Sequence, residues 1–247
     1  MRFDDTPLST GTAFFWEESG KCYLVTNWHN LSGRDANTLK HLNTKSAAEP
    51  NRAAFQIFFG RDLNNRGHSV VELYAHDGFP IWLEHPKHRN LVDVVCIPLP
   101  DETSANVFPI NQALNAQLTA KIADEVFVIG YPLGLSVETT PIWKRASVAS
   151  EPDFDINGRP MIYVDTASSR GMSGSPVLRR GTSGQVEDGS FIISGGMMNT
   201  LIGIYSGRVV AGNSLEAQLG IVWKKQVISE IIQGGMRGTS SAWIIGA

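Results

Sequence analysis

One serine lies between two glycines in the stretch 166-TASSRGMSGSPV-177, which follows the apolar run at residues 161–164. A strand that enters a tight turn of small residues can hold a hydroxyl clear of its own backbone and leave N–H groups free beside it. Gly171 permits the unusual dihedral angles that turn its N–H outward. Ordinary Gly/Ser turns are far more common than active sites, so this stretch alone does not decide between the two.

The order of the chemical groups along the chain narrows the choice. All histidines precede Ser173, and they are found at positions 29, 41, 68, 76, 85 and 88. The α/β-hydrolase order places the histidine after the serine, so that class is excluded. The subtilisin order needs an acid before His29, but none of the candidates there ends a long buried strand; they are Asp4, Asp5, Glu17 and Glu18. The order His, Asp, Ser remains.

His29 follows two β-rich runs, residues 11–16 and 21–26, that flank a turn at Gly20 and predict a hairpin. A histidine where a strand gives way to a loop can be held by the sheet while its ring faces a cleft. The other five histidines lie in polar loop contexts. His85 and His88 form an H-x-x-H pair, but no third ligand is nearby, so the sequence predicts no metal site.

Asp93 is the single charge in the apolar run of residues 91–97. A buried acid is costly unless it is paired, and a carboxylate that orients an imidazole is such a pair. The alternative is that Asp93 begins an edge strand and faces water, with Asp77 or Asp35 as the third member. Both of these lie in turn-like contexts that explain them without catalysis, so the sequence favours Asp93.

Three motifs in this order resemble those of the trypsin-like serine peptidases of the chymotrypsin fold, in the style of the free-standing bacterial trypsin-like peptidase domains. They are TNWH ending at His29, LVDVV centred on Asp93 and GMSGSP containing Ser173. The resemblance extends over about residues 8 to 233, and further similar segments are GTAFF at 11–15, GYPLG at 130–134, GIYSG at 203–207 and LGIVW at 219–223. It implies an all-β fold with two antiparallel six-stranded β-barrels of the chymotrypsin type and a C-terminal helix.

The resemblance also implies a serine endopeptidase that works through an acyl-enzyme. His29, Asp93 and Ser173 would be its catalytic residues, and the N–H groups of Gly171 and Ser173 its oxyanion hole. The base of the primary substrate pocket would lie near Ala167 and Ser168, with Ser206 and Gly207 along its wall. Because no acid lies among these positions, we expect a small to medium apolar side chain before the cut bond rather than Arg or Lys.

Met172 departs from the pattern of zymogen-activated relatives. Those relatives have an aspartate before the serine that pairs with a newly cut N-terminus, whereas this chain has a methionine there. The resemblance therefore implies no activation by N-terminal cleavage.

The chain divides near residues 110–121 into two strand-rich halves. Residues 1–115 would form an N-terminal barrel with His29 and Asp93, and residues 116–247 a C-terminal barrel with Ser173. A helix is predicted at about 223–233, and its apolar face is expected to dock on the second barrel. Three segments are expected to be surface loops or linker, with possible contacts to substrates or regulatory partners: 32–52, 179–190 and the tail 234–247.

Composition is that of an ordinary globular protein of 247 residues with a formal net charge of −3. It gives no reason to expect nucleic acid or an anionic membrane as a partner, and no apolar run approaches the roughly 20 residues that span a bilayer. With two cysteines and no signal-peptide pattern at the start, we expect a cytoplasmic protein without a disulfide framework. We expect no cofactor, and the partners would be protein or peptide substrates.

Two functions of other classes stay open at this point. One is a catalytically silent fold that only binds peptides in its groove. The other is an esterase or acyl transferase that uses the same three residues.

Overall fold

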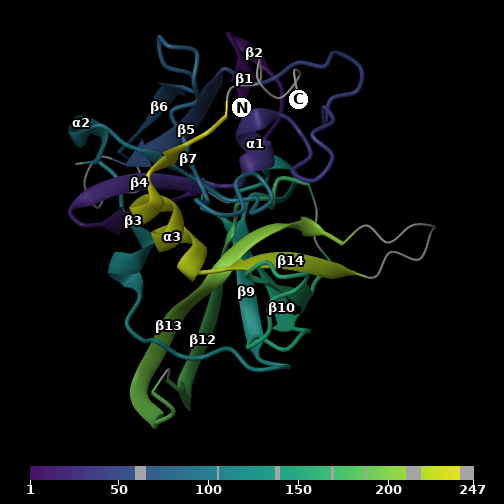
Figure 1. The fold of residues 1–247 in the computed structure, drawn as a ribbon. Coiled ribbons are helices and arrows are strands. Elements are labelled where there is room, and N and C mark those ends of the chain that lie inside the picture. Colours follow the sequence, from purple (N-terminus) through teal and green to yellow (C-terminus); the bar gives the residue numbers. More distant parts are fainter. Residues whose placement is uncertain are drawn as a thin grey trace.

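The computed structural model describes residues 1–58, 65–104, 106–136, 140–167, 170–186, 188–209 and 218–239. Most of the described elements are strands, so the predicted all-β class is confirmed. They fall into an N-terminal and a C-terminal half, which lie one above the other in Figure 1. None of the helices in this described part of the chain is long and apolar enough to cross a membrane.

The C-terminal half is a closed antiparallel barrel with the strand order β10-β11-β14-β13-β12-β9. Its interior is filled by inward-facing aliphatic side chains, among them Val126, Val164 and Val222, which are fully buried. The strands are β9 (Glu125–Gly130), β10 (Ile142–Val148), β11 (Met161–Asp165), β12 (Pro176–Gln185), β13 (Phe191–Arg208) and β14 (Leu219–Lys224).

The N-terminal half consists of two sheets rather than one ring of six strands. The first has the order β2-β1-β5-β6 and the second β15-β7-β8-β4-β3, and no ladder of hydrogen bonds joins them among the described residues. Side chains hold them together instead, because one core cluster contains Leu24 of β4, Ala53 of β5 and Trp82. The strands are β1 (Arg2–Phe3), β2 (Thr6–Pro7), β3 (Phe14–Glu18), β4 (Lys21–Thr26), β5 (Arg52–Phe58), β6 (Arg66–Glu72), β7 (Leu83–Glu84), β8 (Val95–Pro98) and β15 (Met236–Arg237).

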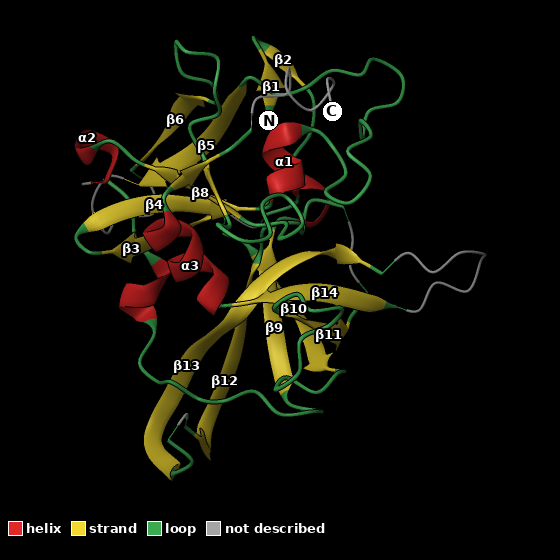
Figure 2. Cartoon of the chain, in the orientation of Figure 1, coloured by secondary structure: helices red, strands yellow, loops and turns green. Residues whose placement is uncertain are grey.

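The C-terminal helix α3 (Gln226–Gly234) lies at the junction of the two halves (Figure 2). It was expected to dock on the second barrel, but its buried face packs in a cluster that contains residues of both halves, such as Val94 and Ile204. In the N-terminal half it contacts β7 and β8, and the hydroxyl of Ser229 donates to Glu18 of β3 at 2.8 Å. The other helices are short: α1 (Trp28–Ser32), α2 (Asp101–Ser104), η1 (Ile110–Ala113) and η2 (Pro132–Gly134).

Two of the three predicted loop segments differ from expectation. Residues 179–185 belong to strand β12, which pairs with β13 in a long hairpin that extends away from the molecule in Figure 1. The sequence did not predict this strand, because its glycines, serine and threonine are typical of loops. A hairpin exposed on both faces needs no alternation of apolar and polar residues. The start of the tail is also fixed, since β15 pairs with β7 and Arg237 binds Asp77. Residues 240–247 lie outside the described residues.

The segment 32–52 lies outside the strands except for its last residue, yet it has an internal anchor. Arg34 is buried and its guanidinium binds the carboxylate of Glu49, with 2.6 Å between Nε and Oε1, and also the carbonyl of Leu39. The loop that follows His29 is therefore ordered around a buried ion pair.

Glu84 is a buried carboxylate on which three side chains converge. It is 2% exposed, accepts the indole N–H groups of Trp28 and Trp82 at 2.9 and 3.2 Å, and pairs with Arg89 at 3.1 Å. Because Trp28 directly precedes His29, this cluster fixes the element that carries the histidine.

We expect Glu84→Ala to lower the free energy of unfolding by about 3–5 kcal/mol, since it leaves a cation and two indole donors without their acceptor. The matched control is Glu72→Ala, which removes the exposed partner of Arg52 and should cost at most about 1 kcal/mol. Urea unfolding measures both, and equal losses would contradict the role given to Glu84.

Candidate active site

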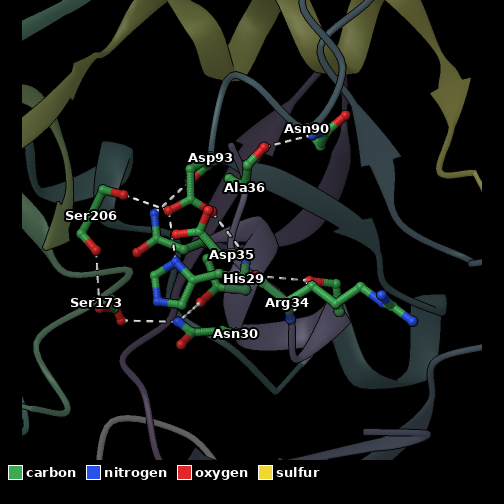
Figure 3. A network of polar contacts seen from close by, with 12 residues as sticks. His29, Asn30, Arg34, Asp35, Ala36, Asn90, Asp93, Ser173 and Ser206 are labelled. Carbon is green, nitrogen blue, oxygen red and sulfur yellow. Dashed lines mark hydrogen bonds and ion pairs between the residues drawn. The ribbon is translucent and has the colours of Figure 1, made fainter. Parts of the chain in front are cut away.

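The predicted site residues come from both halves of the molecule. His29 lies in α1 directly after β4, and Asp93 lies two residues before β8. Ser173 lies in the turn between β11 and β12, and Ser206 is near the end of β13. The structure brings these four residues into one network of polar contacts (Figure 3).

Asp93 holds His29 at two points. The backbone N–H of His29 donates to Oδ1 at 2.9 Å, and Nδ1 lies 2.6 Å from Oδ2. A carboxylate only accepts hydrogen bonds, so in the neutral ring Nδ1 carries the proton and Nε2 keeps its lone pair. Asn27 supports the arrangement by donating its amide to the carbonyl of Asp93 at 2.6 Å. The imidazole is therefore fixed in both orientation and tautomer.

The charge around His29 favours its protonated form. Burial is the largest single effect and lowers the pKa of the imidazole, but the charge and hydrogen bond of Asp93 together with the charge of Asp35 outweigh it. The net pKa lies above the ordinary value for histidine. Such a group is a stronger base than a free imidazole.

Ser173 is linked to the same carboxylate through Ser206. Its hydroxyl donates to the carbonyl of Ser206 at 3.0 Å, and the hydroxyl of Ser206 donates to Oδ2 of Asp93. Figure 3 shows the imidazole of His29 with Asp93 at one edge and Ser173 beyond the other. Nε2 makes no hydrogen bond within the described part of the chain. Sequence reasoning placed Ser206 in a pocket wall and missed its bond to Asp93, which depends on tertiary contact alone.

Thr12 and Asn30 fix the backbone of the serine turn from the N-terminal half. The N–H of Thr12 donates to the carbonyl of Ser173 at 2.8 Å, and its hydroxyl donates to the carbonyl of Gly171 at 2.8 Å. The amide of Asn30 donates to the carbonyl of Ser173 at 3.1 Å. These residues were not among the sequence candidates, because short polar side chains next to a strand have many ordinary explanations.

The N–H groups of Gly171 and Ser173 donate to no other described residue, and both lie in the serine turn. Gly171 has φ +91°, and a Cβ atom there would lie 2.3 Å from the carbonyl oxygen of Tyr131. Only glycine fits both the dihedral angle and the close approach. Among the described residues, the turn therefore leaves two N–H groups without an acceptor, which is what an oxyanion hole would require.

The predicted pocket residues are only partly placed. Ser206 and Gly207 line a cavity of about 490 Å³ together with His29 and Asp93. Ala167 follows β11 and is exposed, and Ser168 lies outside the described residues.

The remaining polar candidates have other partners. Asp35 accepts the N–H groups of Asn37 and Thr38 in its own turn, and the Arg237 guanidinium lowers the pKa of Asp77 to about 2. His85 uses Nε2 for Glu230 at 2.8 Å and accepts two backbone N–H groups at Nδ1. No group of three or more His, Cys, Asp or Glu side chains in the described ranges could hold a metal ion.

Met172 has a fully buried side chain in the core cluster of the C-terminal barrel. The position before the serine is thus filled by hydrocarbon rather than by a carboxylate that could pair with an ammonium group.

The sequence pattern of the family described as trypsin-like peptidase domain matches residues 11–186. The chain belongs to this family. The match includes His29, Asp93 and Ser173, and it ends before Ser206.

The peptidase domain also resembles solved structures of the Rv3671c protease from M. tuberculosis. The active form is 18% identical over 91% of this chain and 72% of that chain, with a TM-score of 0.45. An inactive form is 18% identical over 90% of this chain and 82% of that chain, with a TM-score of 0.44. The inactive form of a serine-to-alanine mutant is 17% identical over 90% of this chain and 80% of that chain, with a TM-score of 0.45. No curated protein matches the chain significantly.

We expect Asp35→Asn to lower the pKa of His29. Removal of the negative charge leaves the imidazolium less stable, so the ring loses its proton at lower pH. An NMR titration of the His29 ring measures the shift directly. Asp153→Asn, which removes an exposed carboxylate that is not among the groups acting on His29, should leave the pKa unchanged. A rise in the pKa with Asp35→Asn would contradict this account of the charge.

Proposed function

We propose that this member of the trypsin-like peptidase family is a serine endopeptidase that cleaves polypeptides through an acyl-enzyme on Ser173. The observation that carries the proposal is the 2.6 Å contact between Nδ1 of His29 and Asp93, with Ser173 tied to the same carboxylate through Ser206. This arrangement offers a nucleophile, a base and an orienting acid in one network.

In the first step, the hydroxyl of Ser173 leaves the carbonyl of Ser206 and turns toward Nε2 of His29. Catalytic hydrogen bonds are often absent in a free enzyme and form only with substrate bound. His29 takes the proton while Oγ bonds to the carbonyl carbon of the scissile peptide. Asp93 stabilises the imidazolium that results.

The carbonyl oxygen becomes negative as this bond forms. The free N–H groups of Gly171 and Ser173 would stabilise it, and loss of one such donor costs about 100- to 1,000-fold in known proteases. The C–N bond then breaks as His29 gives its proton to the leaving amine. Water repeats the cycle on the acyl-enzyme, with His29 again as the base.

We expect Ser173→Ala to abolish labelling by a fluorophosphonate probe and to lower peptide turnover by more than about 10,000-fold. The matched control is Ser175→Ala, two residues along the same turn, because the hydroxyl of Ser175 is buried and has no hydrogen-bond partner among the residues that the structure describes. That variant should keep its labelling. Mass spectrometry of the labelled protein and of a cleaved protein mixture measures both effects.

The same measurements separate the alternatives. A folded wild-type protein without labelling would favour a peptide-binding module. Labelling together with ester hydrolysis but no peptide cleavage would favour an esterase.

We expect cleavage after small to medium apolar residues, because no acid lies among the pocket positions Ala167, Ser168, Ser206 and Gly207. A library of quenched fluorescent peptides that vary before the cut bond measures this preference, with Ser173→Ala as the blank. A strict preference for Arg or Lys would refute it.

A further inference from the structure

A second cavity, of about 420 Å³, lies in the N-terminal half and reaches the C-terminal half at Tyr131 and Gly134. We propose that it binds the apolar side chain of the substrate residue that follows the cut bond. The proposal rests on the proposed peptidase function and adds a recognition site on the leaving-group side of Ser173.

The cavity lies between the two N-terminal sheets, which no ladder of hydrogen bonds joins in the described part of the chain. Leu24 of β4 and Phe15 of β3 line it from one sheet, while Ala53 and Phe55 of β5 line it from the other. A gap in the hydrogen-bond ladder leaves room between them that a closed ring would fill with side chains. Its volume is within the range of about 300–1,000 Å³ found for ligand pockets.

Thr12 connects the cavity to the nucleophile. It lines the cavity and also donates to the carbonyl oxygens of Ser173 and Gly171, at 2.8 Å in each case. The other cavity, with Ser206 and Gly207, shares no lining residue with this one. The carbonyl of Ser173 thus bonds to Thr12 in the lining of this cavity, and its hydroxyl bonds to Ser206 in the lining of the other. Because Ser206 and Gly207 are proposed to bind the residue before the cut bond, the Thr12 side remains for the residue after it.

Apolar side chains form the larger part of the lining, although Gln56, His68 and Ser136 also border the cavity. Phe15 and Phe55 meet edge to face, with their ring centroids 5.8 Å apart. The hydroxyls of Thr12 and Thr26 are already used, toward the carbonyls of Gly171 and Thr12. Neither hydroxyl proton is therefore available to a polar ligand, and an apolar side chain gains by leaving water here.

The apolar surface continues outward along the loop after β9. Leu133 and Leu135 flank Gly134 of the cavity lining, and they are 67% and 60% exposed. The N–H of Leu133 donates to the carbonyl of Arg170 at 2.6 Å, one residue before Gly171. The loop that borders the cavity therefore also contacts the serine turn, and its two leucines add exposed apolar surface next to Gly134. We expect the site to take a leucine-like or phenylalanine-like side chain of a polypeptide.

The test uses amines that take the place of the leaving group. A small activated ester forms the acyl-enzyme, and an amino-acid amide then competes with water for it. The amine nitrogen attacks the acyl carbonyl while His29 takes its proton. The bond between the acyl carbon and Oγ of Ser173 then breaks, and His29 gives the proton to that oxygen, which leaves an amide and the free hydroxyl. For leucinamide and phenylalaninamide we expect a ratio of aminolysis to hydrolysis about tenfold above that for glycinamide.

Two variants should change this preference in opposite directions. Ala53→Leu narrows the cavity and should lower the ratio for phenylalaninamide about tenfold, whereas Phe55→Ala widens it and should raise phenylalaninamide relative to leucinamide. Ala113→Leu, on an exposed helical turn away from the cavity, is the matched control and should change neither ratio. Ester hydrolysis should stay at the wild-type rate in the control Ala113→Leu.

The outcomes distinguish this inference from the proposed function. If the folded wild-type protein forms no acyl-enzyme, the peptidase proposal fails and this inference fails with it. If it is acylated but partitions equally among the three amides, the inference alone is overturned. A preference that stays the same in both folded variants would place the side chain elsewhere and would also overturn it.

Discussion

The buried carboxylate of Asp93 is the constraint that joins the fold to the site. It is 6% exposed and accepts hydrogen bonds from the backbone and ring of His29 and from the hydroxyl of Ser206. A buried charge without partners is strongly destabilising. One of these donors comes from strand β13 of the C-terminal barrel and the others follow β4 of the N-terminal half. Asp93 is therefore fully satisfied only when the halves are docked, and docking places His29 beside the serine turn.

Thr12 is a second point at which the N-terminal half fixes the serine turn. Its bonds to the carbonyls of Gly171 and Ser173 occupy the acceptors of the serine turn and leave the N–H groups for a ligand. The contact is close, because a Cβ atom at Gly174 would lie 2.0 Å from the carbonyl oxygen of Thr12. The glycines around Ser173 thus serve two purposes at once: they allow the backbone of the turn to approach Thr12, and they keep its donors free.

The sequence was sufficient for the elements with local signals. The order of His29, Asp93 and Ser173 and a helix at about 223–233, found at 226–234, could be predicted, because each depends on neighbours in the chain. The local contexts were less accurate, since Asp93 lies two residues before β8 rather than inside a strand, and His29 lies in α1 rather than in a loop. What depends on tertiary contact could not. Strand β12 beyond Arg180 has no apolar alternation, and the two residues of β15 form a strand only because β7 pairs with them. The bond from Ser206 to Asp93 joins residues that are far apart in the sequence.

The two N-terminal sheets are packed by side chains rather than joined by a described ladder of hydrogen bonds, and the second cavity lies between them. Hydrogen bonds close the C-terminal barrel, and its interior is filled with aliphatic side chains. In the N-terminal half the sheets are held by side chains around Leu24, Ala53 and Trp82, and this packing leaves a space next to Thr12. Because the same threonine fixes the backbone of Ser173, a side chain bound in that space would lie against the residue that holds the serine turn. The place where the N-terminal half differs from a closed barrel is therefore next to the serine turn, where a cavity could contribute to the choice of substrate.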